Sequence, residues 1–552
     1  MSTNGRSSDM TFQITQGAIR RPLGRTRGTR IALIAALAAL GGTGQALAAG
    51  DCAALADFED GALSVTSAET VAADDSRPEA CVVMASLAQG EGVSPINFRV
   101  TLPTDWSGRS VQYGGGGFNG VINDNQGARW QTPEAEAAFP FKNHVTFEGD
   151  SGHQQGDLPE SPEVDPRGAS FALVPEEFEN YAGASVPKTF DAAMTLVEAH
   201  YGRLPEYSYF VGFSQGGKEA MVAAQRHAEN YDGILAGDPV MALSGLKMTH
   251  LKGTRVFYEN GGENWVPPET AQAVTAEIIA QCDGLDGLED GWIADFEGCQ
   301  PDLSVMLCEG EDGADCLTEG QLAAINELHA PLELDYELPN GLTGHAGYPW
   351  GNIVWSGSFL GKRPQPGTPV ELGKDAYVYA LGDGYARFFV TQDAEYDALT
   401  FDENDPALRA RIQEVAEIID ATDPDLTPLA EGGTKLIMYA GGASEVPPQE
   451  VAAYWTRMTE ATDVPAEDFA RFYIFPAITH AGIGPQDMPA AADLFSALEA
   501  WVEEDEAPGP MVNSSPKADR VTAERPLCEY PEVPRYNGEG DPMAAASFTC
   551  KP

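Results

Sequence analysis

The chain has 552 residues, of which 84 are Asp or Glu and 33 are Lys or Arg, so its formal net charge is −51. A surface this acidic repels nucleic acid and anionic membranes, which makes both poor partners. The length exceeds one compact core, so we expect two packed units or one core with a large insertion, with room for a deep pocket that takes a small molecule.

Residues 1–49 have the pattern of an export signal. Five arginines between Arg20 and Arg30 precede the apolar run 31–40, and Ala46-Leu47-Ala48 supplies small residues suited to signal peptidase. The apolar run is about half as long as a membrane span requires. The arginine pair at 20–21 is a poor match to a twin-arginine signal, because it stands far from this run. We expect cleavage near Ala48 or Ala49 and a secreted or periplasmic mature protein.

The cysteines point to disulfides. There are eight, an even number in an exported chain, and no Cys-x-x-Cys occurs, which disfavours a zinc ribbon or a redox site. Spacing alone does not fix their connectivity. Their grouping along the chain fits four local bridges: Cys52–Cys81, Cys282–Cys299, Cys308–Cys316 and Cys528–Cys550.

Strand and helix patterns alternate through the mature chain. Short β-rich segments at 97–102 and 110–113 precede a helical pattern at 189–201 and an apolar run at 209–213. This alternation favours a parallel α/β sheet with covering helices. Further sheet strands, 435–439 and 472–475, follow only after residue 430. We therefore predict a catalytic domain formed by residues 50–240 and 434–552.

The intervening residues 241–433 are predicted to form a lid domain. They are rich in Gly, Pro, Trp and acidic residues and contain four of the eight cysteines. This composition is typical of a cap of loops and short helices whose own core is thin and which disulfides support.

The apolar run 209–213 leads into a Gly-x-Ser-x-Gly sequence centred on Ser214. A strand that turns sharply into a helix lifts the side chain at its apex clear, and Gly212 and Gly216 allow the close crossing that this needs. Ser214 is therefore the candidate nucleophile. The amide of Gln215, at the helix N-terminus, is a candidate oxyanion donor.

The four-glycine segment 114–117 is the candidate source of a second oxyanion donor, Gly116 or Gly117. The alternative is a phosphate cradle. That interpretation is disfavoured because no Lys-Ser or Lys-Thr follows the glycines and the surrounding charge is negative.

A candidate metal site lies in the predicted lid. Asp283, Asp286 and Asp290 are spaced by three and four residues in a Gly-rich segment, which suits oxygen ligands around Ca²⁺; a solvated acidic turn is the alternative.

His480 is the candidate general base. It lies in a Gly-flanked loop after a late strand, which suits the order of nucleophile, acid and histidine in α/β-hydrolases. A surface-loop histidine is the alternative. His153 is its rival, but it precedes the nucleophile and is more consistent with a structural or pocket-lining role.

Several of these segments resemble the tannase and feruloyl esterase family, which includes mono(2-hydroxyethyl) terephthalate hydrolase. The resemblance rests on the sequence around the nucleophile, 201–205, 208–212 and 230–237, on the segments 114–120 and 282–287, and on the strand before His480. It implies an exported enzyme with the α/β-hydrolase fold, a large inserted lid domain, a lid calcium ion and a Ser-His-acid triad. By position, the carbonyls of Leu288 and Trp292 would complete the calcium site.

The resemblance also implies that the lid supplies the pocket for the acyl group, which makes Arg387 and Phe388 candidate substrate-binding residues. An aromatic ring can stack on an aromatic acyl group while Arg387 meets a carboxylate or phenol. The alternative is ordinary lid packing with a salt bridge.

The triad acid departs from the family pattern. The family places an aspartate after the strand that corresponds to 435–439, and ungapped alignment puts Ser444 at that position and Glu445 one residue later. Glutamate is an accepted triad acid in this fold, and its extra methylene can offset a displacement of one residue. We expect Glu445, rather than Ser444, to be the acid.

A second departure concerns the cysteines. Family members typically bridge a cysteine before the nucleophile to one after the histidine, and here these positions are Phe213 and Ala481.

The resemblance implies a secreted serine esterase acting on esters of aromatic, phenolic acids. The alternatives are a hydrolase of aliphatic ester or polyester oligomers and a non-catalytic binding homologue that has lost its triad acid.

Overall fold

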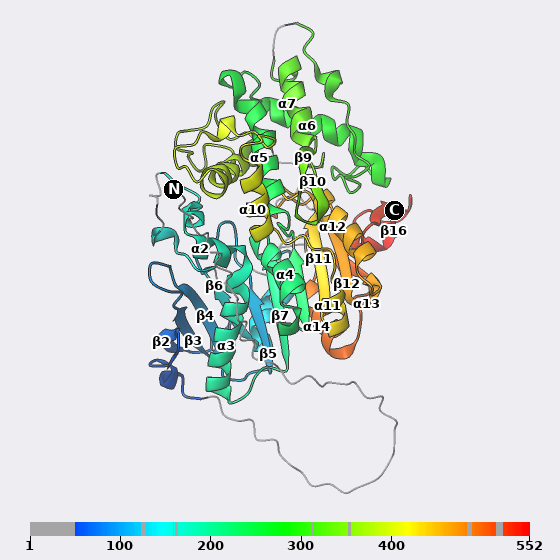
Figure 1. Cartoon of the computed structure of the whole chain (residues 1–552). Coiled ribbons are helices and arrows are strands. Elements are labelled where there is room, and N and C mark those ends of the chain that lie inside the picture. Colours follow the sequence, from blue (N-terminus) through cyan, green and yellow to red (C-terminus); the bar gives the residue numbers. More distant parts are fainter. Residues whose placement is uncertain are drawn as a thin grey trace, which may run out of the picture. The chain divides into compact units, whose positions relative to one another are not determined.

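A ten-stranded sheet runs through the protein (Figure 1), with the strand order β1-β2-β3-β4-β6-β5-β7-β8-β11-β12. The computed structural model describes residues 50–122, 129–157, 159, 164–310, 313–351, 355–482, 488–514 and 523–552. The predicted leader, 1–49, lies outside them. The strands of this sheet are β1 (Glu59–Asp60), β2 (Leu63–Val71), β3 (Ala80–Leu87), β4 (Ile96–Pro103), β5 (Arg109–Tyr113), β6 (Val145–Gly149), β7 (Tyr207–Phe213), β8 (Gly233–Gly237), β11 (Lys435–Gly441) and β12 (Ala470–Phe475).

The sheet is antiparallel from β1 through β4 to β6 and parallel from β6 to β12. The predicted strands 97–102, 110–113, 435–439 and 472–475 fall in β4, β5, β11 and β12. The predicted α/β class is therefore confirmed.

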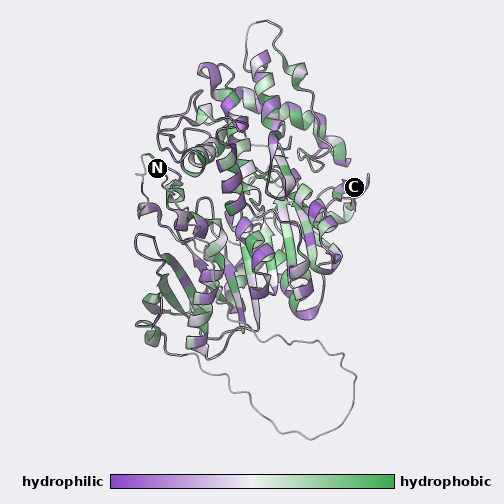
Figure 2. Cartoon of the chain, in the orientation of Figure 1, coloured by the Kyte–Doolittle hydropathy of each residue, from purple (hydrophilic) through white to green (hydrophobic). Residues whose placement is uncertain are grey.

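Helices cover both faces of the parallel part, which explains the continuous apolar run of β7. Phe210 packs in a cluster with residues of α3 (Ser185–Tyr201), α4 (Gln215–Arg226) and α12 (Pro448–Ala461). Tyr209 and Val211 point to the other face and pack with α14 (Leu494–Glu504). A strand buried on both sides is mostly apolar along its whole length, and the buried Ser208 of β7 is hydrogen-bonded to Ser110 of β5. Figure 2 shows the central strands as largely hydrophobic.

Residues 241–433 depart from the sheet and return to it only at β11. They contain α5 (Leu243–Tyr258), α6 (Pro268–Cys282), α7 (Glu319–His329), α8 (Trp355–Ser358), α9 (Tyr377–Gly384), α10 (Arg409–Ile419), α11 (Thr427–Gly432) and a small sheet of β9 (Leu332–Leu338) and β10 (Leu342–His345). The expectation of a thin core is wrong. One apolar cluster, from Phe257 to Val378, is built almost wholly from this segment, and a second joins α5, α9 and α10 to the core around Phe118.

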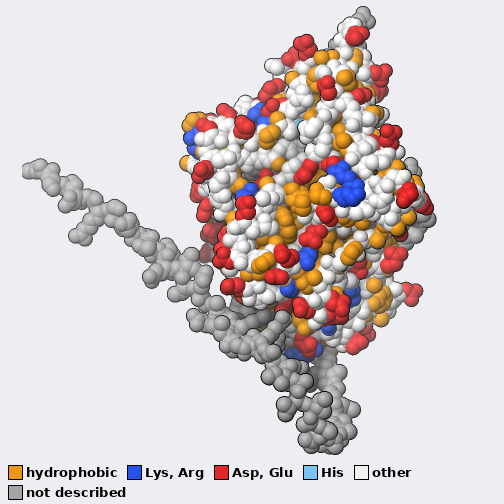
Figure 3. Space-filling view, turned by 90° about the vertical axis from the view of Figure 1, so that its right-hand side faces the viewer, with side chains coloured by type: hydrophobic (Ala, Val, Ile, Leu, Met, Phe, Trp, Pro, Cys, Tyr) orange, Lys and Arg blue, Asp and Glu red, His pale blue; other side chains and the backbone are white. Residues whose placement is uncertain are grey.

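The remaining elements are short. They are α1 (Pro133–Ala138), α2 (Pro175–Glu179), α13 (Ala466–Phe469) and two C-terminal two-stranded sheets, β13 (Met511–Asn513) with β14 (Arg525–Leu527) and β15 (Val533–Tyr536) with β16 (Phe548–Lys551). No helix in the described part of the chain is long and apolar enough to cross a membrane. Figure 3 shows acidic side chains spread over one face, with few basic ones between them.

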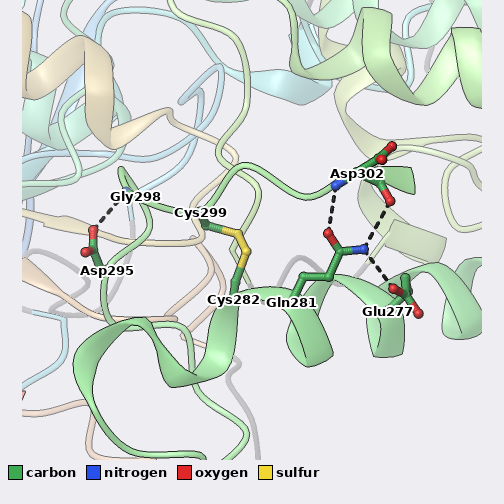
Figure 4. The surroundings of a disulfide bond; sticks show 7 residues. All are labelled: Glu277, Gln281, Cys282, Asp295, Gly298, Cys299 and Asp302. Atoms are coloured by element: carbon green, nitrogen blue, oxygen red, sulfur yellow. Dashed lines mark hydrogen bonds between the residues drawn. A yellow bond between two sulfur atoms is a disulfide. The ribbon is translucent and has the colours of Figure 1, made fainter. Parts of the chain in front are cut away.

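The four predicted disulfides are confirmed: Cys52–Cys81, Cys282–Cys299, Cys308–Cys316 and Cys528–Cys550. Cys282, at the end of α6, is bonded to Cys299, and both are buried. Beside this bond, Gln281 accepts a hydrogen bond from the Asp302 amide and donates to the Asp302 carbonyl, so α6 is tied twice to the following loop (Figure 4).

The buried Cys282–Cys299 bond should stabilise the lid more than the partly exposed Cys308–Cys316 bond. The variant Cys282→Ser/Cys299→Ser should lose about 3 kcal/mol of unfolding free energy, because it frees a longer loop in the unfolded chain and buries two hydroxyls. Denaturant unfolding followed by tryptophan fluorescence measures this. The matched control Cys308→Ser/Cys316→Ser should lose less, and an equal or larger loss in the control would contradict the prediction.

Candidate active site

Ser214 lies at a strained turn between β7 and α4. Its backbone has φ 63° and ψ −120°, in the positive-φ region that non-glycine residues rarely adopt. A Cβ on Gly212 would stand 1.9 Å from the Gly216 carbonyl oxygen, and one on Gly216 would stand 2.7 Å from that of Gly115. Both positions therefore require glycine, and the crossing that exposes the Ser214 hydroxyl depends on them.

His480 joins Ser214 to a buried carboxylate. Its Nε2 is 2.7 Å from Ser214 Oγ, and its Nδ1 is 2.5 Å from Oδ2 of Asp238. Asp238 is fully buried and follows β8, which pairs in parallel with β7. With Nδ1 donating to Asp238, Nε2 is left to accept the serine proton. This is the arrangement of nucleophile, base and acid that activates a serine.

The expectation that Glu445 is the acid is wrong for this geometry. Glu445 Oε2 accepts a hydrogen bond from the backbone amide of His480 at 3.0 Å, and Oε1 accepts one from Ser358 at 2.5 Å. No hydrogen bond joins its carboxylate to the imidazole in the described chain. The side chains of Ser444 and Glu445 leave the chain in different directions, so the extra methylene cannot recover the position.

Ser444 supports the acid instead. Its hydroxyl donates to Asp238 Oδ2 at 2.5 Å and lies 3.4 Å from His480 Nδ1. The Gly441 amide donates to the other oxygen of Asp238 at 3.3 Å. Sequence reasoning missed Asp238, although a signal was present: it is a carboxylate placed directly after the strand that follows the nucleophile.

The glycine loop is held by a buried carboxylate. Glu219 on α4 accepts hydrogen bonds from the Gly115 amide at 2.9 Å and from Asn119 Nδ2 at 2.7 Å. Burial raises the pKa of Glu219, and these hydrogen bonds partly offset that effect. Because Gly115 is occupied in this way, the predicted donors further along the loop are better placed than Gly115 itself, and Gly117 borders the same pocket as Ser214 and Gln215.

Aromatic rings pack where the family resemblance implies a disulfide. The ring of Phe213 lies 4.9 Å from that of His480, and Trp130 lies 5.1 Å from Phe213 on an edge. Arg129 is 5.2 Å from the centre of the Phe213 ring. Ala481 is exposed. Phe213 therefore supports the imidazole directly, by packing.

A pocket with about 460 Å³ of empty volume, part of it open to solvent, contains the Ser214 and His480 side chains in its wall. Lid helices supply most of the rest. From α5 come Leu243, Leu246, Lys247 and His250, and from α9 come Tyr377, Val378 and Leu381. The spacing of the α5 residues places them on one face of that helix.

The structure does not place Arg387 and Phe388 in this pocket. Both are buried, and Arg387 forms an ion pair with Asp383 at 3.0 Å and donates to the carbonyls of Ala394 and Val164. These side chains belong to the packed interior of the lid, which is the alternative that the sequence left open. His153 is also buried, stacked on Phe171 beneath the glycine loop.

The predicted calcium ligands lie on one loop after α6. Asp283 accepts hydrogen bonds from the amides of Asp290, Gly291 and Trp292, and Asp290 forms an ion pair with Arg525 at 2.7 Å. Asp286 is buried and accepts from the Leu288 amide. The oxygen donors have the chemistry that Ca²⁺ requires, but no group of three or more acidic, histidine or cysteine side chains in the described part is arranged as a metal site.

Comparisons with known proteins identify the family of the chain. The family model described as "Tannase and feruloyl esterase" matches residues 81–551. An uncharacterized esterase of Agrobacterium fabrum is 32% identical over 86% of this chain and 85% of its own. Mono(2-hydroxyethyl) terephthalate hydrolase of Piscinibacter sakaiensis is 28% identical, with 86% and 85% covered.

Two solved structures show the same fold. Feruloyl esterase B from Aspergillus oryzae superimposes with a TM-score of 0.75 at 22% identity, covering 91% of this chain and 99% of that one. Tannin acyl hydrolase from Aspergillus niger gives a TM-score of 0.62 at 20% identity, with 89% and 92% covered. The nucleophile turn, its histidine and the extent of these matches lead to one conclusion: the chain belongs to the tannase and feruloyl esterase family and is a carboxylic ester hydrolase.

Proposed function

We propose that this protein is a secreted serine esterase that hydrolyses esters of aromatic acids through a Ser214-His480-Asp238 triad. The observation that carries the proposal is the unbroken line of hydrogen bonds from the Ser214 hydroxyl through the imidazole to a buried carboxylate. The apolar side chains from α5 and α9 beside Ser214 suit an aromatic acyl or alcohol group.

The reaction follows from these positions. As Ser214 Oγ attacks the carbonyl carbon of the ester, His480 Nε2 takes the proton of the Ser214 hydroxyl. Asp238 stabilises the imidazolium that forms. The amides of Gln215 and of Gly116 or Gly117 hold the oxyanion. The tetrahedral adduct collapses, the alcohol leaves with the proton from His480, and water, activated in the same way, releases the acid from the acyl-enzyme.

Asp238 also bears on the non-catalytic alternative. That alternative rested on the Ser-Glu sequence at 444–445, where the family resemblance implies an aspartate. We propose that the acid function has moved from position 444 to position 238, on the neighbouring strand end, and that Ser444 now holds the relocated carboxylate.

Aliphatic esters and polyester oligomers remain the second candidate substrates, because the pocket wall is apolar and need not select a ring. An ester panel on the purified protein separates them: aromatic acyl esters should have the higher kcat/KM. Higher values for aliphatic esters of the same alcohol would transfer the proposal to that class.

Export is part of the proposal. The leader pattern at residues 1–49 and the four disulfides both fit an oxidising compartment. N-terminal sequencing of protein recovered outside the cytoplasm should begin near residue 49 or 50. Recovery of uncleaved protein in the cytoplasm would contradict it.

Asp238→Asn should lower kcat by about 10³- to 10⁴-fold, because an amide holds the wrong tautomer of His480 and cannot stabilise the imidazolium. Glu445→Gln keeps the hydrogen-bonding shape beside the His480 amide and should lower kcat far less. Steady-state kinetics with a chromogenic ester measures both. A larger loss in Glu445→Gln than in Asp238→Asn would restore Glu445 as the acid.

The relocation has its own test. In Asp238→Ala/Ser444→Asp, the new carboxylate arises where a side-chain oxygen already lies 3.4 Å from His480 Nδ1. The double variant should therefore recover at least tenfold of the activity lost in Asp238→Ala, since a carboxylate again stabilises the imidazolium. The control is Ser444→Ala in the Asp238→Ala background, which should recover nothing. Equal activities of the two double variants would count against the relocation.

We also propose that the loop from Asp283 to Trp292 binds Ca²⁺ through Asp283, Asp286, Asp290 and the carbonyls of Leu288 and Trp292. The role is structural, since none of these residues borders the Ser214 pocket. Chelation followed by dialysis should lower the melting temperature, and added Ca²⁺ should restore it, because a ligand that binds only the folded state stabilises it. Asp286→Asn should abolish the response. Metal analysis that finds no calcium, with no effect of chelator, would refute the site.

A further inference from the structure

One cation in the Ser214 pocket has no polar partner among the described residues. Lys247, on α5, is only 5% exposed, and its side chain borders the same cavity as Ser214 and His480. No hydrogen bond or ion pair joins its ammonium group to another described residue. The Lys247 Nζ lies 5.7 Å from the centre of the Phe118 ring.

Lys218, another buried lysine in the described part of the chain, does have polar partners. Lys218, fully buried on α4, donates to the Tyr181 carbonyl at 3.2 Å and neighbours the carboxylate of Glu219. Lys247 lacks both kinds of partner, although the chain contains 84 acidic residues against 33 basic ones. In a protein so rich in carboxylates, a buried cation without one requires an explanation.

A second cation lies at the rim of the same pocket. Arg167 donates to the Tyr377 hydroxyl at 3.1 Å, and its Nη2 lies 3.4 Å from the point where a Cβ on Gly117 would stand. Tyr377 and Gly117 both border the pocket. In the described part of the chain no carboxylate forms an ion pair with Arg167 either, so a second positive side chain contacts two residues of the pocket wall.

An isolated buried ammonium destabilises a fold, because it gives up its hydration without a compensating charge. Burial, and to a lesser extent the positive charge of Arg167, lower the pKa of Lys247 to about 7. The remaining titratable groups around the pocket are His250, His480, Glu445, Tyr181 and Tyr377. His250 is neutral, because burial and the Lys247 charge hold its pKa well below the usual value. Glu445 is engaged with the His480 amide and Ser358.

We propose that Lys247, with Arg167 at the rim, binds an ionised carboxylate carried by the substrate, so that this esterase favours esters with a free acid group. The inference rests on the proposed esterase function and narrows its substrate class. The apolar residues Leu243, Leu246 and Leu381 would contact the body of the substrate, and the ester would lie at Ser214. A bound carboxylate supplies the partner that Lys247 lacks in the structure.

The test compares two esters with the same scissile bond. The monoethyl ester of benzene-1,4-dicarboxylic acid carries a free carboxylate, and the diethyl ester does not. The wild type should prefer the monoester in kcat/KM, and Lys247→Met should reduce the monoester-to-diester ratio by about 10- to 100-fold, as expected for loss of one charge-assisted hydrogen bond. The reduction should lie mainly in KM. Lys252→Met removes the same charge from α5 outside the pocket and should leave the ratio unchanged.

The pH dependence provides a second readout. Only protonated Lys247 binds the anion. The monoester-to-diester ratio of kcat/KM should therefore fall as the pH rises through about 7, the pKa of Lys247 in the free enzyme. Because the two esters share the scissile bond, pH effects on the chemical step that are common to both cancel in the ratio. In Lys247→Met the ratio should be flat with pH. The variant should also melt at the same temperature as the wild type or higher, because methionine is buried without desolvating a charge.

The outcomes separate the two proposals. Hydrolysis of the diester with a ratio that Lys247→Met does not change would overturn the carboxylate site and leave the esterase intact. If neither ester is cleaved, calorimetry on Ser214→Ala decides: benzene-1,4-dicarboxylate should bind, and the additional change Lys247→Met should abolish binding. A comparison of 4-acetoxybenzoate with phenyl acetate shows whether the enzyme binds a carboxylate on the leaving alcohol rather than on the acyl group. If the enzyme prefers the carboxylate-bearing ester in neither pair, the inference is refuted.

Discussion

The hydrogen bonds from Asp238 through His480 to Ser214 are the interaction on which the rest of this structure depends. They join Ser214 and Asp238 to His480, which follows them by 266 and 242 residues. Ser214 and Asp238 stand at the carboxyl ends of neighbouring parallel strands, where β7 and β8 pair up to Phe213 and Gly237. One residue beyond each strand, both side chains reach the same imidazole. The parallel pairing of β7 with β8 therefore brings Ser214 and Asp238 to the same edge of the sheet.

Several residues around His480 together fix the position of its imidazole. Asp238 binds its ring nitrogen, Ser444 fixes Asp238, and Glu445 anchors the backbone of the histidine loop. Phe213 packs against the ring itself. Each contact restrains a different degree of freedom, so the position of His480 does not depend on a covalent bridge next to the active site. The four disulfides lie elsewhere in the chain.

The inserted residues 241–433 supply much of the wall of the Ser214 pocket. One face of α5 supplies part of the apolar wall and also Lys247, which forms no ion pair with any described residue, and other α5 side chains, such as Met248 and Leu251, pack into an apolar cluster with α9 and α10. A buried cation lowers stability, and a pocket wall is the place where that cost can be offset by a ligand. Arg387 illustrates the contrast: it is equally buried, but Asp383 and two carbonyl groups satisfy it, so it has no capacity left for a substrate.

Sequence alone determined the features that depend on local chemistry. The glycines around Ser214 are required by the turn itself, the strands are legible as continuous apolar runs, and the cysteines pair with neighbours in the chain. His480 was found because it follows a late strand in a glycine-flanked loop. Only the tertiary structure decided which carboxylate binds the imidazole, because the direction of a side chain matters more than its distance along the chain. Glu445 is adjacent to Ser444, yet its carboxylate binds the His480 amide and Ser358. Asp238, at the end of β8, binds the imidazole instead. The same holds for Lys247 and Arg387, since whether a charged side chain faces a cavity or a carboxylate depends on how helices pack, and no periodicity in the sequence encodes that.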